Sequence, residues 1–250
     1  MIAPVSFNRP KTAMVLAAGL GTRLKPITDT LPKPLVQVAG RSLLDRCLDR
    51  LVEAGVQRAV VNIHWLGEQI RSHLQSRKDI ETVISDESDA LLETGGGLVR
   101  ALPLLGDAPF FSVNADLIWR DARGNSLKRL AQRFDAAEMD ALLLLQPTTA
   151  ATGYDGQGDF TMDQMGRLTR RDIRAVAPFV YTGVQIVSPA LLRDAPAGAF
   201  SLNLLYNRAI EAGRLYGMRH EGDWMDVGTH AGIAEAEARL AEPISHGRRT

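Results

Sequence analysis

Cysteine is almost absent from the 250-residue chain, and neither sign of charge predominates. The single cysteine, Cys47, excludes internal disulfides, iron–sulfur clusters and cysteine-based zinc sites, and its helical spacing with leucines favours a core residue. The 29 basic and 29 acidic residues cancel, which removes any global attraction to nucleic acid or to a membrane. No apolar run reaches the roughly 20 residues of a membrane span, and residues 1–11 lack the apolar core of a secretion signal. The sequence therefore predicts a cytoplasmic protein.

Long linkers, internal repeats and low-complexity tracts are also missing. A single domain over residues 1–250 is the simplest organisation, with frayed ends expected at residues 1–11 and 244–250. The composition, 45% hydrophobic and 23% charged, is that of an ordinary globular chain.

Apolar, strand-like runs alternate with amphipathic helical stretches along the chain. This alternation predicts an α/β fold, a Rossmann-like three-layer sandwich whose mostly parallel central sheet carries helices on both faces. The expected strands are 12–18, 58–63, 81–85, 109–114, 140–145 and 179–187. The expected helices are 42–54, 67–75, 96–102, 126–137, 201–212 and 229–241. Segment 148–177, rich in Gly, Thr, Asp and Arg, predicts an irregular insertion at the ligand-binding edge of the sheet.

The first strand leads into a loop of glycines and basic residues, Leu16-Ala17-Ala18-Gly19-Leu20-Gly21-Thr22-Arg23-Leu24-Lys25-Pro26. The glycines let backbone N–H groups approach an anion closely, while Arg23, Lys25 and Lys33 add positive charge, so the loop favours a phosphate cradle. A dinucleotide-binding fingerprint would need a third glycine at Leu24, and the Gly-Lys-Ser/Thr of a P-loop occurs nowhere. A tight turn without ligand would explain the glycines but not the basic residues.

Two aspartates occupy positions suited to a divalent cation. Asp116 follows a predicted strand at the edge where α/β sheets bind ligands, although a turn or helix-capping role is the simple alternative. Asp226 lies between apolar residues just before a helix, a poor setting for a lone carboxylate. Because Mg²⁺ favours one or two carboxylates plus substrate phosphates, the two aspartates together predict one Mg²⁺ site. The five histidines show no paired ligand spacing, which disfavours zinc.

The glycine loop and a downstream lysine resemble the signature of the sugar-1-phosphate nucleotidylyltransferases. The similar residues form two halves, Leu16-Ala17-Ala18-Gly19-x-Gly21-Thr22-Arg23-Leu24-x-Pro26-x-Thr28 and Pro32-Lys33-Pro34-Leu35, and a late Trp224-x-Asp226-x-Gly228-Thr229 agrees. Members of this family join a sugar 1-phosphate to a nucleoside triphosphate and release pyrophosphate. The resemblance implies catalytic roles for Arg23, which holds the triphosphate, and for Lys33, which reaches the α-phosphate and the sugar phosphate.

The same resemblance implies that Asp116 and Asp226 bind the metal and that the glycine-rich segment 92–97 reads the nucleobase. Without the resemblance, that segment is equally well a plain helix start. The residues implied in nucleotide binding are Ala17, Gly19, Gly21, Thr22, Arg23, Lys33, Glu93 and Gly95.

Within the family, Leu-Glu-Thr-Gly-Gly-Gly at 92–97 and Asn-x-His-Trp-Leu at 62–66 are most similar to the N-acetylmuramate 1-phosphate uridylyltransferases. This implies UTP as the nucleotide, UDP-N-acetylmuramate as the product and a role in cell-wall recycling. It also implies that Asn114 and Asp159 contact the sugar phosphate. The chain departs from the family where many members have Glu-Lys-Pro, because it has Thr-Arg-Arg-Asp at 169–172. Our hypothesis is that Arg170 and Arg171 meet the lactyl carboxylate of N-acetylmuramate.

Two other functions stay open. A heptose- or hexose-1-phosphate guanylyl- or uridylyltransferase would use the same chemistry. A catalytically silent regulatory subunit that binds a sugar nucleotide ranks lower, because it would be expected to lose Lys33 or a metal aspartate. The expected partners are a nucleoside triphosphate and a sugar 1-phosphate, with Mg²⁺ as cofactor and with no nucleic acid or membrane. The oligomeric state is not indicated.

Overall fold

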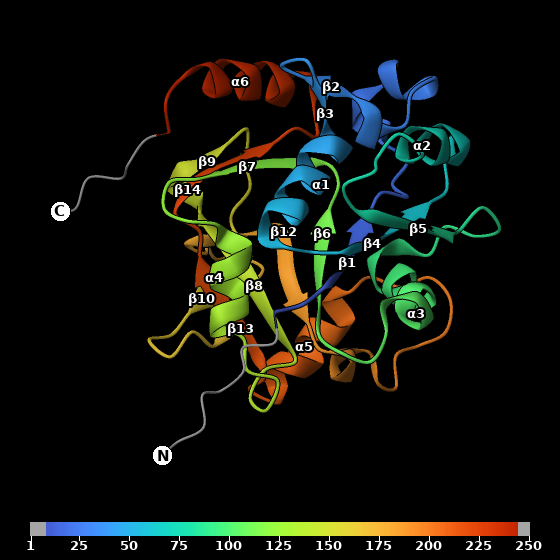
Figure 1. The fold of residues 1–250 in the computed structure, drawn as a ribbon. Coiled ribbons are helices and arrows are strands. Elements are labelled where there is room, and N and C mark those ends of the chain that lie inside the picture. The colour runs from blue at the N-terminus through green and yellow to red at the C-terminus, as the bar shows by residue number, and fades with distance from the viewer. Residues whose placement is uncertain (1–8, 245–250) are drawn as a thin grey trace.

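A nine-stranded sheet runs through the centre of the protein in a computed structural model that describes residues 9–244 (Figure 1). Along the sheet the strands lie in the order β11-β10-β12-β6-β1-β4-β5, and β8 joins β12 to β13. The strands of this sheet are β1 Thr12–Leu16, β4 Arg58–Ile63, β5 Glu81–Asp86, β6 Phe110–Asn114, β8 Ala141–Pro147, β10 Phe160–Met162, β11 Leu168–Arg170, β12 Phe179–Val187 and β13 Leu215–Arg219.

The part of the sheet that follows the glycine loop is parallel. Strand β1 pairs in parallel with β4 and with β6, and β4 pairs in parallel with β5. The carboxyl ends of these four strands therefore meet at one edge, as expected for a ligand-binding α/β sheet. Strand β12 runs antiparallel to both β6 and β8. The run of apolar residues predicted this strand correctly, but such a run carries no information on strand direction.

Helices cover both faces of the sheet, which confirms the three-layer arrangement. The helices are α1 Leu43–Ala54, α2 Gly67–Leu74, α3 Glu93–Leu105, α4 Ser126–Arg133, α5 Asn203–Glu211 and α6 His230–Ala241. Side chains of α1, α2 and α4 share one apolar core with Val15 and Val61, and α1 and α4 lie in front of the sheet in Figure 1. Met14 and Val60 point to the other face and pack with α3 and α5, in keeping with the two-residue period of a strand. Cys47 is fully buried in the first core, as expected.

Outside segment 148–177, five strands were not expected from the sequence: the short strands β2 (Gln37–Val38) and β3 (Arg41–Ser42), and the longer strands β7 (Leu117–Asp121), β13 and β14 (Gly222–Asp226). In β7 and β14, charged residues that pair with each other in the fold obscure the strand pattern. Arg120 of β7 lies directly opposite Asp223 of β14, and the two form an ion pair at 2.5 Å. Strand β14 also pairs with β9 (Ala151–Thr152), which gives a second, three-stranded sheet. A third, two-stranded sheet joins β2 to β3.

Some helix ends also differ from the expectation. Helix α3 begins at Glu93 rather than at Gly96 and continues past Leu102 to Leu105. Tertiary contacts extend its start, because the N–H groups of Gly95 and Gly96 donate to the Phe200 carbonyl at 2.9 and 3.3 Å. Helix α4 ends at Arg133 rather than at residue 137. The turn that follows is closed by the N–H groups of Glu138 and Met139, which both donate to the Asp135 carbonyl.

Segment 148–177 is more regular than expected. It contains the short strands β9, β10 and β11, and the β10–β11 hairpin extends the main sheet through the pair Phe160↔Phe179. The loops around residues 153–159 and 171–178 are irregular, as expected.

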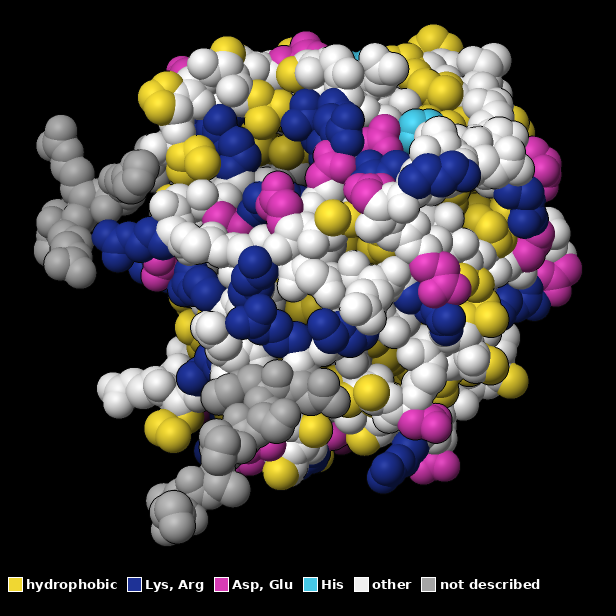
Figure 2. All heavy atoms as spheres, viewed as in Figure 1, with side chains coloured by type: hydrophobic (Ala, Val, Ile, Leu, Met, Phe, Trp, Pro, Cys, Tyr) yellow, Lys and Arg dark blue, Asp and Glu magenta, His cyan; other side chains and the backbone are white. Residues whose placement is uncertain are grey.

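The expected fraying at the N-terminus does not extend to Pro10 and Lys11. Pro10 is buried, and the Lys11 carbonyl accepts hydrogen bonds from the N–H groups of Gln57 and Arg58. Residues 1–8 and 245–250 lie outside the described residues. Within residues 9–244, no helix is long and apolar enough to cross a membrane. On the face drawn in Figure 2, Lys and Arg side chains lie beside Asp and Glu side chains over much of the surface, consistent with the zero net charge.

Candidate active site

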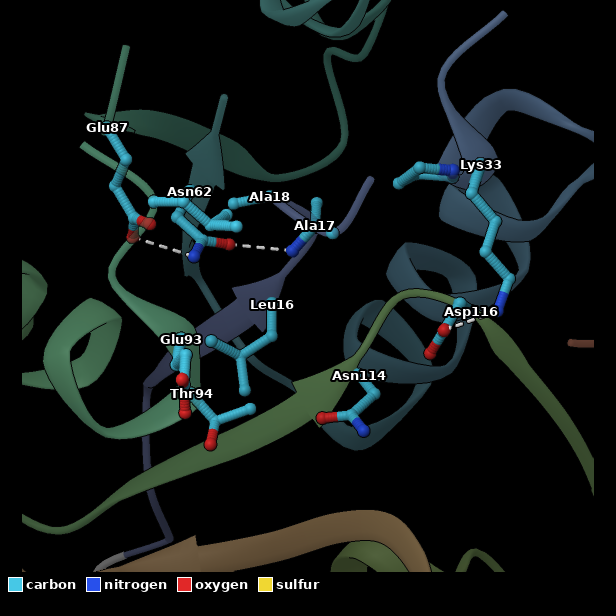
Figure 3. A pocket seen from close by; sticks show the side chains of 13 residues that line it. Leu16, Ala17, Ala18, Lys33, Asn62, Glu87, Glu93, Thr94, Asn114 and Asp116 are labelled. Carbon is cyan, nitrogen blue, oxygen red and sulfur yellow. Dashed lines mark hydrogen bonds and ion pairs between the residues drawn. The ribbon is translucent and has the colours of Figure 1, made fainter. Parts of the chain in front are cut away.

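A pocket opens at the carboxyl ends of the parallel strands, where the sequence analysis placed the ligand (Figure 3). Its walls come from the glycine loop, from the start of α3 and from the segment after β6. The lining residues are Leu16, Ala17, Ala18, Gly19, Lys33, Pro34, Asn62, Glu87, Leu91, Glu93, Thr94, Asn114 and Asp116. Of the residues expected to bind nucleotide or sugar phosphate, this pocket brings together Ala17, Gly19, Lys33, Glu93 and Asn114.

The two halves of the loop motif pack directly against each other. Gly21 has φ of 64°, and a Cβ there would lie 2.9 Å from Thr28 Cγ2 and 3.0 Å from Lys33 Cβ. Thr28 Oγ1 in turn donates to the Gly21 carbonyl at 2.8 Å. Only glycine suits this close, left-handed turn. No contact is found within 4 Å of a Cβ placed at Gly19, which leaves the backbone there open to a ligand.

Arg23 links the glycine loop to the late Trp-x-Asp-x-Gly-Thr motif. A Cβ at Gly228 would lie 2.5 Å from Arg23 Nη2, so the guanidinium group rests on the glycine backbone. A side chain at this position would require the Arg23 guanidinium group to move. It also places the arginine that was expected to hold the triphosphate next to the segment that carries Asp226.

The two candidate metal ligands lie at the same corner of the fold. Asp226 of β14 is directly opposite Leu117 of β7, and Asp116 immediately precedes Leu117. Asp226 Oδ1 accepts the Gly228 N–H at 2.8 Å, which orients that carboxylate. Within residues 9–244 there is no group of three or more His, Cys, Asp or Glu side chains that could hold a metal. Two carboxylates suit Mg²⁺, which takes its other ligands from water and phosphates.

Lys33 and Asp116 form an ion pair inside the pocket. The Lys33 Nζ lies 2.5 Å from Asp116 Oδ2, and Lys33 is only 7% exposed (Figure 3). Lys33 lies between Pro32 and Pro34 and begins the short helical turn Lys33–Leu35, which fixes the start of its side chain. The ammonium group is thereby placed at the carboxyl end of β6, where phosphate charge would have to be neutralised.

In the segment that was expected to read the nucleobase, the glycines contact the pocket less than expected. The Gly95 N–H donates to the Phe200 carbonyl, and a Cβ at Gly95 would lie 2.2 Å from the Phe200 ring. The glycine therefore makes room for residue 200, while Glu93 and Thr94 line the pocket. The Ala17 N–H is also engaged, because it donates to Asn62 Oδ1 at 2.6 Å.

Sequence reasoning did not single out Asn62, Glu87, Leu91 or Thr94 as site residues. Asn62 gave a signal that could have been used, because it is a polar residue inside the buried apolar run of β4. Glu87 gave no local signal, since its position in the pocket depends on strands that are distant in sequence.

The residues expected to contact the sugar lie on the same edge of the sheet as the pocket. A Cβ at Gly183 of β12 would lie 3.0 Å from Asn114 Nδ2, so the amide packs against the β12 backbone. Further along β12, the Tyr181 N–H donates to Asp159 Oδ2 at 2.8 Å. Because β12 runs antiparallel to β6, Tyr181 extends beyond the carboxyl end of β6, where Asn114 and Asp116 lie.

Arg170 and Arg171 are engaged within the protein. Arg170 donates to Asn207 Oδ1 at 2.7 Å and to Asn203 Oδ1 at 3.2 Å, and it stacks over the Phe160 ring. Arg171 donates to five acceptors of its own segment, which are Gly158 O, Gln157 Oε1, Asp172 O, Ile173 O and Ala175 O. This arrangement does not support Arg171 as a free partner for a substrate carboxylate, because its guanidinium group already holds the loop together.

A family comparison decides the class of protein. The sequence model of the nucleotidyl transferase family, described as "Nucleotidyl transferase", matches residues 12–170. The chain is a member of this family. The match spans the glycine loop, Lys33, Asp116 and the pocket. It confirms the resemblance to the sugar-1-phosphate nucleotidyltransferases inferred from the two halves of the loop motif.

Two relatives with similar sequences share one name. The chain is 45% identical over 237 residues to the N-acetylmuramate alpha-1-phosphate uridylyltransferase of Caulobacter vibrioides. The aligned region covers 93% of this chain and 98% of the relative. The chain is 34% identical over 229 residues to the enzyme of the same name from Neisseria meningitidis, covering 90% and 96%. Among solved structures, HddC from Yersinia pseudotuberculosis complexed with GMP-PN has a TM-score of 0.75 at 21% identity, covering 92% and 99%, and shares the fold.

Proposed function

We propose that the protein transfers a uridylyl group from UTP to N-acetylmuramate 1-phosphate, forming UDP-N-acetylmuramate and pyrophosphate. The similarity to two relatives of that name over nearly their whole length is the observation that carries this specificity. The Leu-Glu-Thr-Gly-Gly-Gly segment at the start of α3 supports UTP as the nucleotide. A reaction that consumes UTP suits the cytoplasm, and its product suits peptidoglycan recycling.

In the proposed reaction, a phosphate oxygen of the sugar 1-phosphate attacks the α-phosphorus of UTP. The bond from the α-phosphorus to the bridging oxygen breaks, and pyrophosphate leaves with the electron pair. No side-chain base is required, because the attacking phosphate is already an anion. The protein's task is to position the two phosphates in line and to neutralise their charge.

Each part of the site has a role in this step. The backbone around Gly19, Gly21 and Thr22 and the Arg23 guanidinium group bind the triphosphate, and they stabilise the departing pyrophosphate. Lys33 neutralises charge on the α-phosphate and on the sugar phosphate. The sugar end of the substrate is bound by Asn114 and Asp159.

The carboxylates of Asp116 and Asp226 fit a Mg²⁺ ion, because they are brought to one corner by the β7–β14 register and one is oriented by the Gly228 N–H. When bound there, Mg²⁺ supplies positive charge to the triphosphate oxygens. The base is read by the walls to which Ala17 and Glu93 belong, and Gly95 allows the start of α3 to pack against Phe200.

The deciding experiment is pyrophosphate release, with and without Mg²⁺, across a matrix of substrates. UTP, GTP, dTTP and CTP are each paired with N-acetylmuramate, N-acetylglucosamine, glucose, mannose and heptose 1-phosphates. Turnover confined to UTP with the muramyl sugar and dependent on Mg²⁺ is the expected result. Turnover confined to another pair would replace the substrates but keep the reaction. A folded protein that binds a sugar nucleotide but turns over no pair would indicate a regulatory subunit instead.

A further inference from the structure

A buried hydrogen-bond chain lies beneath the pocket and has no role in the mechanism above. Asn62 is 2% exposed and Glu87 is fully buried. Asn62 Oδ1 accepts the Ala17 N–H at 2.6 Å, and Asn62 Nδ2 donates to Glu87 Oε1 at 2.8 Å (Figure 3). Ala17 follows β1, Asn62 is near the end of β4, and Glu87 follows β5. One amide side chain therefore ties together the ends of three adjacent strands.

Glu87 is an unusual residue to find in this position. Burial raises the pKa of its carboxyl group, while the hydrogen bond from Asn62, the charge of Arg100 and the Leu92 N–H oppose that rise. Within residues 9–244, Glu87 Oε2 accepts no well-formed hydrogen bond. Its backbone is fixed as well, by a bond from the Glu87 N–H to the Ile63 carbonyl and by His64 Nδ1 at 2.7 Å from the Glu87 carbonyl. Burying a carboxyl group is costly, which indicates that this geometry has a function.

Helix α3 rests directly on the two side chains. A Cβ at Gly97 would lie 2.9 Å from Glu87 Oε1 and 3.1 Å from Asn62 Nδ2. Only a residue without a side chain allows this approach. The same helix brings Glu93 and Thr94 to the pocket, and Ala17 lines the pocket from the glycine loop. The Asn62–Glu87 pair thus lies between these two walls and contacts both.

We propose that Asn62 and Glu87 are positioning residues that set the separation of the two walls around the nucleobase. This inference rests on the proposed function, because it takes the space between Ala17 and the start of α3 as the place of the base. A flat pyrimidine ring gains affinity only when both walls are held at the right distance before it arrives. The pair achieves this from the floor of the pocket, which both residues help to line.

Exchanging the acid and the amide tests this role. Asn62→Asp puts a carboxylate against Glu87 and removes the donor, so we expect the Kd for UTP to rise about tenfold. In a steady-state assay, KM for UTP should rise by a similar factor while kcat changes by less than about threefold. Glu87→Gln keeps an acceptor for Asn62 and should bind UTP like the wild type. In the double variant Asn62→Asp/Glu87→Gln, the introduced amide can donate to the introduced carboxylate, and UTP binding should recover.

Tripolyphosphate separates positioning of the base from a general loss of structure, since it has phosphates but no base. Its Kd, measured by calorimetry, should be unchanged in Asn62→Asp, whereas a loosened fold would weaken both ligands. Asp86→Asn is the matched control, because Asp86 is an exposed acid next to Glu87 that bonds Arg71 and the Ser88 N–H. This variant should bind both ligands like the wild type.

Unchanged UTP binding in Asn62→Asp, or a defect that the double variant does not recover, would overturn the proposal. If Asn62→Asp does not fold, Glu87→Ala takes its place, because it deletes the acceptor without adding charge. That variant should lose UTP binding selectively, and equal UTP affinity in Glu87→Ala and wild type would also overturn the proposal. If the wild type binds another nucleoside triphosphate instead of UTP, the proposed function fails, and the same variants measured with that nucleotide still test the pair.

Discussion

The nucleotide end and the insertion end of the site are built on different principles. At the nucleotide end, polar groups from distant segments face one another in the pocket, as Lys33 does with Asp116. At the insertion end, segment 148–177, several polar groups bond to nearby backbone, although Arg170 bonds the side chains of Asn203 and Asn207. Arg171 is the extreme case, because all five of its acceptors lie between Gln157 and Ala175.

The difference shows what a sequence motif can and cannot reveal. Phosphate chemistry requires particular residues at fixed spacing, so the glycine loop and Lys33 form a pattern that can be recognised in the sequence. The insertion uses the same residue types to hold its own shape, and a sequence does not distinguish an arginine that binds substrate from one that binds a carbonyl. Mutations at the first end should therefore act on catalysis, and mutations at the second on shape or stability.

The largest expected effect is that of Lys33→Ala. Removing one preorganised charge at a transferring phosphate costs about 3 kcal/mol, which is a loss of about a hundredfold in kcat/KM. The melting temperature should change little. The matched control is Lys25→Ala, because Lys25 lies in the same loop but is exposed and paired with Asp29 at 3.1 Å. A Lys33→Ala enzyme with wild-type turnover would remove the lysine from the mechanism.

The second largest expected effect is a loss of folding stability at low pH, caused by a buried histidine away from the pocket. His220 is 2% exposed between β13 and β14, and burial lowers its pKa to about 4. Asp121 Oδ1 lies 3.7 Å from His220 Nδ1, but Arg50 is also paired with Asp121. An unfolded histidine titrates near 6.5, so the unfolded state binds the proton more readily as the pH falls. The contribution of His220 to the free energy of unfolding is therefore fully present above about pH 6.5. Up to about 3 kcal/mol of it is lost as the pH falls to about 4.

Urea unfolding at several pH values measures this loss of stability. The variant His220→Gln has no imidazole at this position, so the pH dependence caused by His220 should be absent. The difference in unfolding free energy between wild type and variant should shrink as the pH falls, although other groups titrate in both proteins. Identical pH dependence in the two proteins would show that His220 does not control it. kcat per folded molecule should not differ between them, which is the behaviour expected of a buried group outside the pocket.

A smaller effect concerns Lys33 and the metal at the nucleotide end. In the structure the lysine ammonium neutralises Asp116, so a cation has to compete with it for that carboxylate. Lys33→Met should therefore raise the affinity of the nucleotide-free protein for Mn²⁺, by about tenfold, although the same change lowers activity. Electron paramagnetic resonance of free Mn²⁺ gives the affinity directly. Asp116→Asn should lower it, and equal affinity in wild type and Lys33→Met would show that the ion pair does not limit metal binding.

The sequence predicted the parallel half of the fold and the loop chemistry because both depend on local patterns. Apolar runs predicted β1, β4, β5 and β6 closely, and the pocket did form at their carboxyl ends. What could not be predicted depends on distant pairing. Strand β14 was hidden because Asp223 is neutralised by Arg120 of β7, and Glu87 became a pocket residue only through Asn62 and Gly97.

The smallest expected effect tests the insertion end itself, through Arg171→Ala. If Arg171 only holds the loop, its loss should weaken all sugar phosphates alike, by about fivefold for one lost set of hydrogen bonds. If instead it binds the lactyl carboxylate, the loss should be specific to the muramyl sugar. Binding of N-acetylmuramate 1-phosphate is therefore compared with that of N-acetylglucosamine 1-phosphate, which lacks the lactyl group. Because Nε and Nη1 of Arg171 already bond five loop acceptors, we expect the affinity ratio of the two sugars to stay unchanged. If Arg171→Ala lowered the affinity for N-acetylmuramate 1-phosphate relative to N-acetylglucosamine 1-phosphate, Arg171 would recognise the sugar. The insertion end would then bind substrate through its side chains, as the nucleotide end does.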